Sequence, residues 1–421
     1  MFKKLFNEDW LATIAGLLIM LLAIILTSLA GSELITGHSS VPSMVIMPKN
    51  LDTNGDWSNL LLFFGGLFLI TFVALSLQKK SVNNLFWSLL TVVALSFAAN
   101  YIASMGTVKE LTGLEGVFFA VAIGLLVSNT VGTPKWLKGA LHSEFYVKIG
   151  LVLLGTTIIF SEIMTAGLLG MMQALIVILS VWGFAYWMAR KFNVDREMST
   201  MLASAVSICG VSAAIATAGA IKGDSKKLSY VISLVLVCAI PMMYIMPYVV
   251  GWLGLSAEVG GAWLGGTIDT TGAVVAAGSA LGEVGEKYSV IVKSSQNVLL
   301  GFAALFISIY WTYKGKGHRD KASVGLLWER FPKFVLGFIV ASLIFSFVLE
   351  APMAKEVIKS TKNLQNALFS VAFVCIGLET RFKDIFDDKF SRPMYAFLIA
   401  QLFNIILTLI VASVLFGHIL F

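Results

Sequence analysis

Two segments of this sequence are rich in glycine, serine, threonine and alanine within an otherwise strongly apolar chain. They are VSICGVSAAIATAGAIKG at residues 206–223 and GGAWLGGTIDTTGAVVAAG at residues 260–278. Small side chains let a helix unwind at membrane depth where its backbone lines a cavity. The unwound ends expose backbone N–H groups and the positive end of a helix dipole, which together favour an anion. Tight helix packing alone is the alternative interpretation of the same composition.

The side chains that could complete such an anion site carry a hydroxyl or a thiol, or are absent at a glycine. We predict that the substrate ligands are Cys209, Gly210, Ser212, Thr267, Thr270 and Thr271. None of these groups distinguishes one oxyanion from another, so the pattern predicts a class of ligand and not a compound.

Ionisable residues inside apolar spans cost about 2.5–3.5 kcal/mol each on insertion scales, so each needs a reason to be there. Asp269 lies inside the second small-residue segment, and Lys293 follows in the next span. Either the two form a buried pair, or Asp269 binds a coupling H⁺ or Na⁺ while Lys293 holds the anion. Lys148 is a further charge partner for the site, or it snorkels to the membrane surface.

The signatures of enzymes and metal sites are absent from the sequence. It has no GxxxxGK[ST] loop and no HExxH motif, and GVSAA at residues 210–214 lacks the last glycine of a GxSxG elbow. Cys209, Cys238 and Cys375 lack CxxC spacing. We therefore expect no catalytic residue, no metal site and no cofactor other than a coupling Na⁺ or H⁺.

The elements that must position these residues are membrane helices. Hydrophobic residues make up 58% of the chain and charged residues 13%, against about 45–50% and about 25% in soluble domains. The apolar stretches have the length of helical spans and lack strand alternation. The fold class is therefore an all-α polytopic integral membrane protein with 11–13 membrane segments, near residues 10–31, 59–78, 84–104, 112–131, 145–163, 165–189, 197–221, 229–252, 256–281, 287–312, 331–350, 363–380 and 394–417.

Basic residues fall in alternate connections between these segments, which sets the orientation. The rule predicts a cytoplasmic N-terminus and an external C-terminus, in a multi-pass protein of the bacterial inner membrane. We expect the first helix to stay uncleaved, because the apolar run at residues 11–30 is too long for a signal peptide and lacks a small-residue cleavage site. The net charge of +6 is then an orientation signal, and no nucleic-acid partner is expected. Lys222, Lys226 and Lys227 break the pattern if segment seven crosses fully. Re-entrant seventh and ninth segments, which leave eleven crossings, remove this conflict.

The remaining polar stretches are short. Residues 31–58 are predicted as an extracytoplasmic loop with turns and residues 313–330 as a basic cytoplasmic loop. Neither is long enough to be a separate domain, so residues 1–421 are predicted to form a single transmembrane transporter domain.

Two internal matches indicate inverted repeats. Residues 151–163 match residues 373–385, pairing Gly155 with Gly377 and Glu162 with Asp384, and an odd number of crossings separates the copies. Residues 207–220 match residues 267–280 more weakly. Inverted repeats favour alternating access. Chance similarity between apolar stretches is the alternative.

The runs SICGVSAAIATAGAIKG, GGTIDTTGAVVAAG and FYVKIGLVLLGTTIIFSEI resemble the YeiH-type family of proposed sulfate exporters, from about Leu114 to the C-terminus. This family belongs to a superfamily with sodium/proton antiporters and bile-acid symporters. The resemblance implies broken helices, a core that moves against a scaffold, and a homodimer of the kind that superfamily members often form. Lys148 and Lys293 match basic positions of relatives. Asp269 and Thr270 stand where many relatives carry His-Glu, so the coupling ion or the substrate can differ.

These observations together predict a secondary active transporter that exports a small anion, such as sulfate, a sulfonate or a carboxylate, coupled to H⁺ or Na⁺. Its partners would be that anion and the lipid bilayer. The alternatives are a passive anion channel on the same scaffold and, from another class, a membrane-embedded enzyme or scaffold protein.

Overall fold

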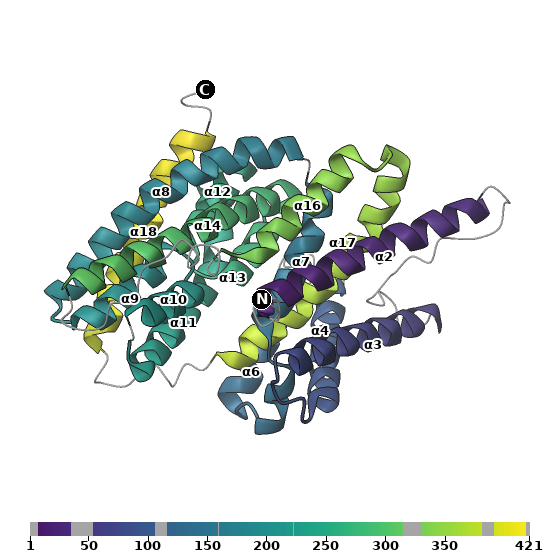
Figure 1. The fold of residues 1–421 in the computed structure, drawn as a ribbon, viewed down its shortest axis with the longest axis horizontal. Coiled ribbons are helices and arrows are strands. Elements are labelled where there is room, and N and C mark those ends of the chain that lie inside the picture. Colours follow the sequence, from purple (N-terminus) through teal and green to yellow (C-terminus); the bar gives the residue numbers. More distant parts are fainter. Residues whose placement is uncertain are drawn as a thin grey trace. The chain divides into compact units, whose positions relative to one another are not determined.

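The computed structural model describes residues 7–34, 54–105, 116–158, 160–221, 223–314, 331–380 and 391–417. Within these ranges every regular element is a helix, as the sequence predicts, and six helices are long and apolar enough to cross a membrane. The chain divides into two compact units, Met1–Ser161 with Lys333–Glu379, and Glu162–Pro332 with Thr380–Phe421. They are called unit 1 and unit 2 below, and their helices are labelled in Figure 1.

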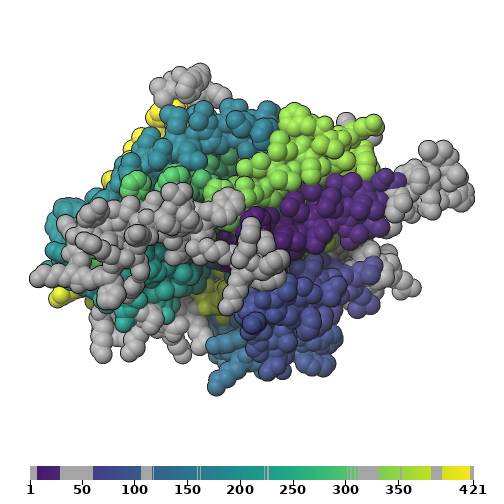
Figure 2. Space-filling model, in the orientation of Figure 1, coloured from purple at the N-terminus to yellow at the C-terminus, as the bar shows by residue number. Residues whose placement is uncertain are grey.

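Unit 1 is a bundle of long helices that pack closely at glycines. Its elements are α2 (Glu8–Leu34), α3 (Asn54–Leu77), α4 (Leu85–Ser104), α6 (Gly116–Thr130), η1 (Lys135–Ala140), α7 (Ser143–Leu154), η2 (Gly155–Thr157), α16 (Lys333–Phe347) and α17 (Ala351–Glu379). In Figure 2, α2 lies between α16 and α3 on the visible face of this unit. Gly124 of α6 and Gly377 of α17 meet where the two backbones touch, since a Cβ on Gly377 would stand 2.8 Å from the Gly124 Cα.

The first predicted repeat falls on α7 with η2 and on α17. Gly150 packs against Phe369, and the hydroxyls of Thr156 and Thr361 lie 3.0 Å apart. The residue number rises from 150 to 156 on the first segment and falls from 369 to 361 on the second, so the two segments run antiparallel. This is the opposite orientation that the sequence match requires. Residues 382–385 of the second copy lie outside the described residues.

Unit 2 is built around two interrupted helices. Its elements are α8 (Phe160–Lys191), which enters the unit at Glu162, α9 (Arg196–Ser207), α10 (Val211–Ile221), α11 (Ser225–Trp252), α12 (Ala257–Thr267), α13 (Thr271–Ser279), α14 (Gly282–Lys314) and α18 (Ser391–Phe416). The predicted seventh segment is thus α9 and α10, and the predicted ninth is α12 and α13. Both are discontinuous, as expected.

The α9–α10 segment folds back on itself and does not cross the unit. Glu197, in the first turn of α9, accepts a hydrogen bond from the backbone N–H of Asp224, which follows α10. Lys227 of α11 donates to Asp195 and Glu197, each at 2.9 Å. The start of α9 and the end of α10 therefore lie at the same end of unit 2 (Figure 1), and the re-entrant alternative holds for this segment.

The α12–α13 segment is a second hairpin. A Cβ on Gly260, in the first turn of α12, would stand 3.1 Å from Leu281, which follows α13. Gly261 and Gly265 pack on Gly285 and Ser289 of α14, so α12 and α14 run parallel. Helix α13, which connects them in the chain, runs in the opposite direction. Because the long helix α11 connects the two hairpins, they enter unit 2 from opposite ends.

The predicted polar connections are shorter than expected where the structure describes them. Helix α2 continues to Leu34, α3 begins at Asn54, and α14 continues to Lys314. The predicted loops at 31–58 and 313–330 are therefore wrong at these margins, because the flanking helices extend into them. Their remaining residues, 35–53 and 315–330, lie outside the described residues.

Candidate functional site

Each hairpin turns at a break of three residues between its two helices, called its tip below, and the two breaks fall at equivalent positions of the sequence match. Helix α9 ends at Ser207 and α10 begins at Val211, while α12 ends at Thr267 and α13 begins at Thr271. The second sequence match paired Ser207 with Thr267, so the structure breaks both copies at equivalent positions. The tips also touch, since a Cβ on Gly210 would stand 3.1 Å from the Cβ of Asp269.

Lys293 of α14 holds both tips. Its ammonium Nζ donates to the carbonyl oxygens of Ile208 and Ile268, each at 2.8 Å, and to Gln296 Oε1 at 2.9 Å. Ile208 and Ile268 are the C-cap residues of α9 and α12. A single buried cation therefore faces the negative ends of two half-helices, which is the favourable arrangement for a helix dipole. All three ammonium protons are used in these bonds.

Two amide side chains tie the same hairpins together and were missed by the sequence analysis. Gln296 Nε2 donates to Ser207 O at 2.9 Å and Gly266 O at 3.4 Å. Asn404 Nδ2 of α18 donates to Val206 O at 3.3 Å and Thr267 O at 3.1 Å. Each side chain thus bridges one carbonyl of each hairpin. The available signal was an amide side chain inside a predicted membrane span.

The N-terminal ends of α10 and α13 also begin at the tips. Gly210 has φ +54°, a left-handed conformation that suits glycine, and its carbonyl accepts from the N–H of Ala214. Thr270 caps α13, with its Oγ1 accepting from the N–H of Ala273 at 3.4 Å. Two positive helix ends therefore start within the same buried region where the two negative ends are neutralised by Lys293.

Several buried oxygen atoms around the tips have no hydrogen-bond partner. They are both carboxylate oxygens of Asp269, the Thr267 hydroxyl oxygen, and the side-chain amide oxygens of Gln173, Asn297 and Gln401. Asp269 and Thr267 are each 1% exposed. Buried polar atoms in native proteins are nearly always paired, so this group requires an explanation.

The structure brings the predicted site residues of both segments into this one region of unit 2. The first tip consists of Ile208, Cys209 and Gly210, and the second tip includes Asp269 and Thr270. Ser212 lies in the first turn of α10, and Thr271 in the first turn of α13. Asn297 Nδ2 donates to the Thr271 hydroxyl at 3.3 Å. Their roles toward substrate and coupling ion stay predictions.

Lys148 belongs to unit 1, where it has carboxylate partners of its own. Its Nζ lies 2.7 Å from Asp9, 3.1 Å from Glu144 and 3.3 Å from Glu8. In the same unit, Ser143 Oγ donates to Glu379 at 2.7 Å. The ammonium of Lys148 is thus neutralised locally, which weakens the case for it as a charge partner of the anion.

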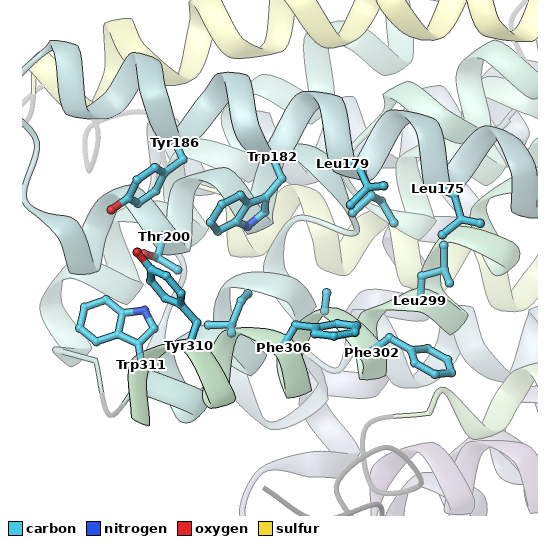
Figure 3. A pocket seen from close by; sticks show the side chains of 13 residues that line it. Leu175, Leu179, Trp182, Tyr186, Thr200, Leu299, Phe302, Phe306, Tyr310 and Trp311 are labelled. Carbon is cyan, nitrogen blue, oxygen red and sulfur yellow. The ribbon is translucent and has the colours of Figure 1, made fainter. Parts of the chain in front are cut away.

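A separate groove of about 430 Å³ lies between α8 and α14, and Figure 3 shows its side chains facing one another across it. Leu175, Leu179 and Trp182 line one wall, and Phe302 and Phe306 the other. Its lining is almost wholly apolar, with hydroxyls only at the end near Thr200. The apolar part of this groove offers no hydrogen-bond donor to an anion.

Comparison with known proteins identifies relatives over most of the chain. The family described as Conserved hypothetical protein 698 matches residues 87–396. A UPF0324 membrane protein of Rhodopirellula baltica is 38% identical over 379 residues, which cover 86% of this chain and 69% of the relative. A UPF0324 membrane protein of Nitratidesulfovibrio vulgaris is 39% identical over 318 residues, or 72% of this chain and 55% of the relative.

The chain therefore spans just over half the length of the Nitratidesulfovibrio relative. A UPF0324 membrane protein of Nitrosomonas europaea is 27% identical over 442 aligned positions, covering 90% of this chain and 89% of the relative. No solved structure matches the chain. The chain is a membrane protein of the UPF0324 family, which is the YeiH-type family that its sequence resembles.

Proposed function

We propose that this protein is a secondary active transporter that moves a small anion, such as sulfate, a sulfonate or a carboxylate, coupled to H⁺ or Na⁺. The observation that carries the proposal is the pair of hairpins, α9–α10 and α12–α13, which enter unit 2 from opposite ends and meet at equivalent breaks. Inverted repeats around discontinuous helices are the architecture by which transporters give one site alternating access. Export is the direction that the resemblance implies.

The anion would bind at the first turns of α10 and α13. Backbone N–H groups there point toward the tips, and Ser212 and Thr271 add hydroxyls. Lys293 would act on the anion through its charge and not by direct contact, because its three protons are committed to Ile208, Ile268 and Gln296. Asp269 would bind the coupling cation. Cys209, Thr267 and Thr270 would shape the same site.

We further propose that the open end of the α9–α10 hairpin faces the cytoplasm, with the N-terminus on the same side of the inner membrane. Arg190, Lys191 and Arg196 lie at this end, and Lys227 joins them by its ion pairs with Asp195 and Glu197. The re-entrant path thus brings Lys227, one of the three lysines that break the charge pattern, back to the basic side. The small anion and the bilayer are the proposed partners. A homodimer is proposed only from the resemblance to the superfamily.

The test is uptake of radiolabelled sulfate, taurine and simple carboxylates into proteoliposomes, with and without imposed proton and sodium gradients. Gradient-driven accumulation of one anion is the expected result. Leak without accumulation would favour the passive channel, and no flux of any anion under any gradient would remove the proposal. No observation in the described residues favours an enzyme, and turnover of a substrate without transport would be needed to revive that alternative.

The anion site is tested by Ser212→Ala with Thr271→Val, which we expect to raise the KM for the anion about tenfold or more if each lost hydrogen bond is worth about 1 kcal/mol. Ser279→Ala is the matched control, because this hydroxyl lies at the far end of α13 and donates to Ala276 O at 2.8 Å. An unchanged KM in the double variant would place the anion elsewhere.

A further inference from the structure

The hydrogen-bond donors and acceptors around the hairpin tips do not balance. The ammonium and amide donors of four side chains there are already used: Lys293 on three oxygens, Gln296 and Asn404 on two carbonyls each, and Gln401 Nε2 on Thr267 O at 3.1 Å and Met242 Sδ at 3.2 Å. The buried oxygens left without a hydrogen-bond partner include those of Thr267, Asp269 and Gln401. The region therefore has an excess of oxygen acceptors, and these include both oxygens of one buried carboxylate.

These three residues are neighbours. Thr267 and Asp269 flank Ile268 at the α12–α13 tip. Gln401 of α18 donates a hydrogen bond to the Thr267 carbonyl. Gln401 and Lys293 both face the Asp269 carboxyl. All three are deeply buried, with 1% of Thr267, 1% of Asp269 and 4% of Gln401 exposed. An ionised carboxylate buried there with only Gln401 and Lys293 facing it would be unfavourable.

We propose that Thr267, Asp269 and Gln401 form a binding site for a single hard monovalent cation, Na⁺. A proton on Asp269 would supply only one further donor for the oxygens of these three residues. A sodium ion takes several oxygen ligands at once. Its single charge balances the single carboxylate, because the Lys293 charge already faces the negative ends of α9 and α12. A divalent cation is excluded by charge, because Ca²⁺ and Mg²⁺ sites need further carboxylates or phosphates to balance them.

The second hairpin tip has this site and the first does not. At the equivalent positions of the α9–α10 tip, Cys209 replaces Asp269 and Ser207 replaces Thr267, and the Ser207 hydroxyl is committed to Ala203 O at 2.7 Å. The inverted repeat is therefore symmetric in its backbone and asymmetric in its ion ligands, so of the two hairpin tips only the second would bind Na⁺. This inference rests on the proposed function only in naming its coupling ion, because binding can be measured without transport.

The experiment measures thermal unfolding of the purified full-length protein in detergent, in NaCl, KCl or N-methylglucamine chloride at equal ionic strength, from pH 6 to pH 8. Saturating Na⁺ is expected to raise Tm by roughly 2–8 °C over the other cations. Asp269→Asn and Thr267→Val should abolish this Na⁺-specific shift. Ser207→Ala, the equivalent position in the first hairpin, should retain it.

Equal Tm in Na⁺ and K⁺ across this pH range overturns the inference, as does a Na⁺ shift that survives in Asp269→Asn. If a variant fails to fold, binding of ²²Na⁺ to the wild-type protein, competed by unlabelled Na⁺ but not by K⁺, decides instead. Anion accumulation driven by a proton gradient in sodium-free buffer would reject Na⁺ coupling and leave the transporter proposal standing. A specific Na⁺ shift without any anion flux would do the reverse.

Discussion

Glu197 and the backbone N–H of Asp224 are joined by a hydrogen bond, although a helical hairpin of both α9 and α10 separates them in the chain. The contact brings the entry and the exit of the segment to one end of unit 2. It also places the carboxylates of Asp195 and Glu197 within reach of Lys227. A fully crossing segment would hold these groups a membrane thickness apart, about 30 Å.

Cysteine accessibility tests this hairpin directly. In a background without the three native cysteines, Asn193→Cys and Asp224→Cys should react with a membrane-impermeant thiol reagent from the same side of the membrane, the cytoplasmic side if basic residues lie inside. Glu283→Cys, in the first turn of α14, should react only from the opposite side. Labelling of positions 193 and 224 from opposite sides would show that the segment crosses.

The sequence supports the helical fold, the two discontinuous segments and the grouping of Asp269 with Lys293, because each rests on local composition or on the cost of a buried charge. It could not decide between crossing and re-entrant paths. A stretch such as 197–221 has the same length and hydropathy on either path, and the decisive contacts join Glu197 to residues after α10.

The hydrogen-bond partners of Lys293 could not be predicted from the sequence either. The predicted alternatives were Asp269 and an anion, yet its protons go to backbone carbonyls of Ile208 and Ile268, which have no signature in residue type. Gln296, Gln401 and Asn404 were visible as polar residues within apolar helices, but their function depends on carbonyls that only the breaks in α9 and α12 expose.

The contact between Gly124 and Gly377 predicts a strong effect of a single methyl group. In Gly377→Ala the new Cβ would stand 2.7 Å from the backbone nitrogen of Leu125, and a helix backbone cannot move aside cheaply. We expect a loss of about 1–3 kcal/mol in the free energy of unfolding, measured by denaturant titration in detergent. Gly65→Ala is the control, since a Cβ there has nothing within 4 Å. Equal stability of the two variants would contradict this packing.

Asp195 combines a helix cap with an ion pair, and two substitutions separate these roles. Its side chain accepts from the Met198 N–H at 3.1 Å and from Lys227 Nζ at 2.9 Å. Asp195→Asn keeps a good cap and should lose less than about 1 kcal/mol in unfolding free energy, and less still at high salt. Asp195→Ala removes both interactions and should lose about 1–2 kcal/mol more than the amide.

The pH dependence of the Asp195 contribution follows from its pKa. Burial alone would raise the pKa of Asp195, but hydrogen bonds from Lys227 and the Met198 N–H outweigh it and hold the pKa below its usual value. The stabilisation is therefore fully present above the unfolded-state pKa of about 3.9 and is lost as the pH falls through the lower folded-state pKa. The difference in unfolding free energy between wild type and Asp195→Asn should vanish there, and a difference that grows on acidification would contradict it.

Removal of the Lys293 ammonium should weaken both hairpins at once. Lys293→Met keeps the apolar stem and leaves the Ile208 and Ile268 carbonyls without this donor, so we expect a loss of roughly 2–5 kcal/mol in unfolding free energy. Hydrogen exchange measured by mass spectrometry should rise at both tips, residues 206–212 and 266–272, and not at one alone. Lys287→Met on the same helix, where the side chain is only partly buried, is the control and should change stability by about 0.5 kcal/mol or less. Faster exchange at only one tip would mean that the hairpins are fastened separately, since a lysine that bridges both must release both when its charge is removed.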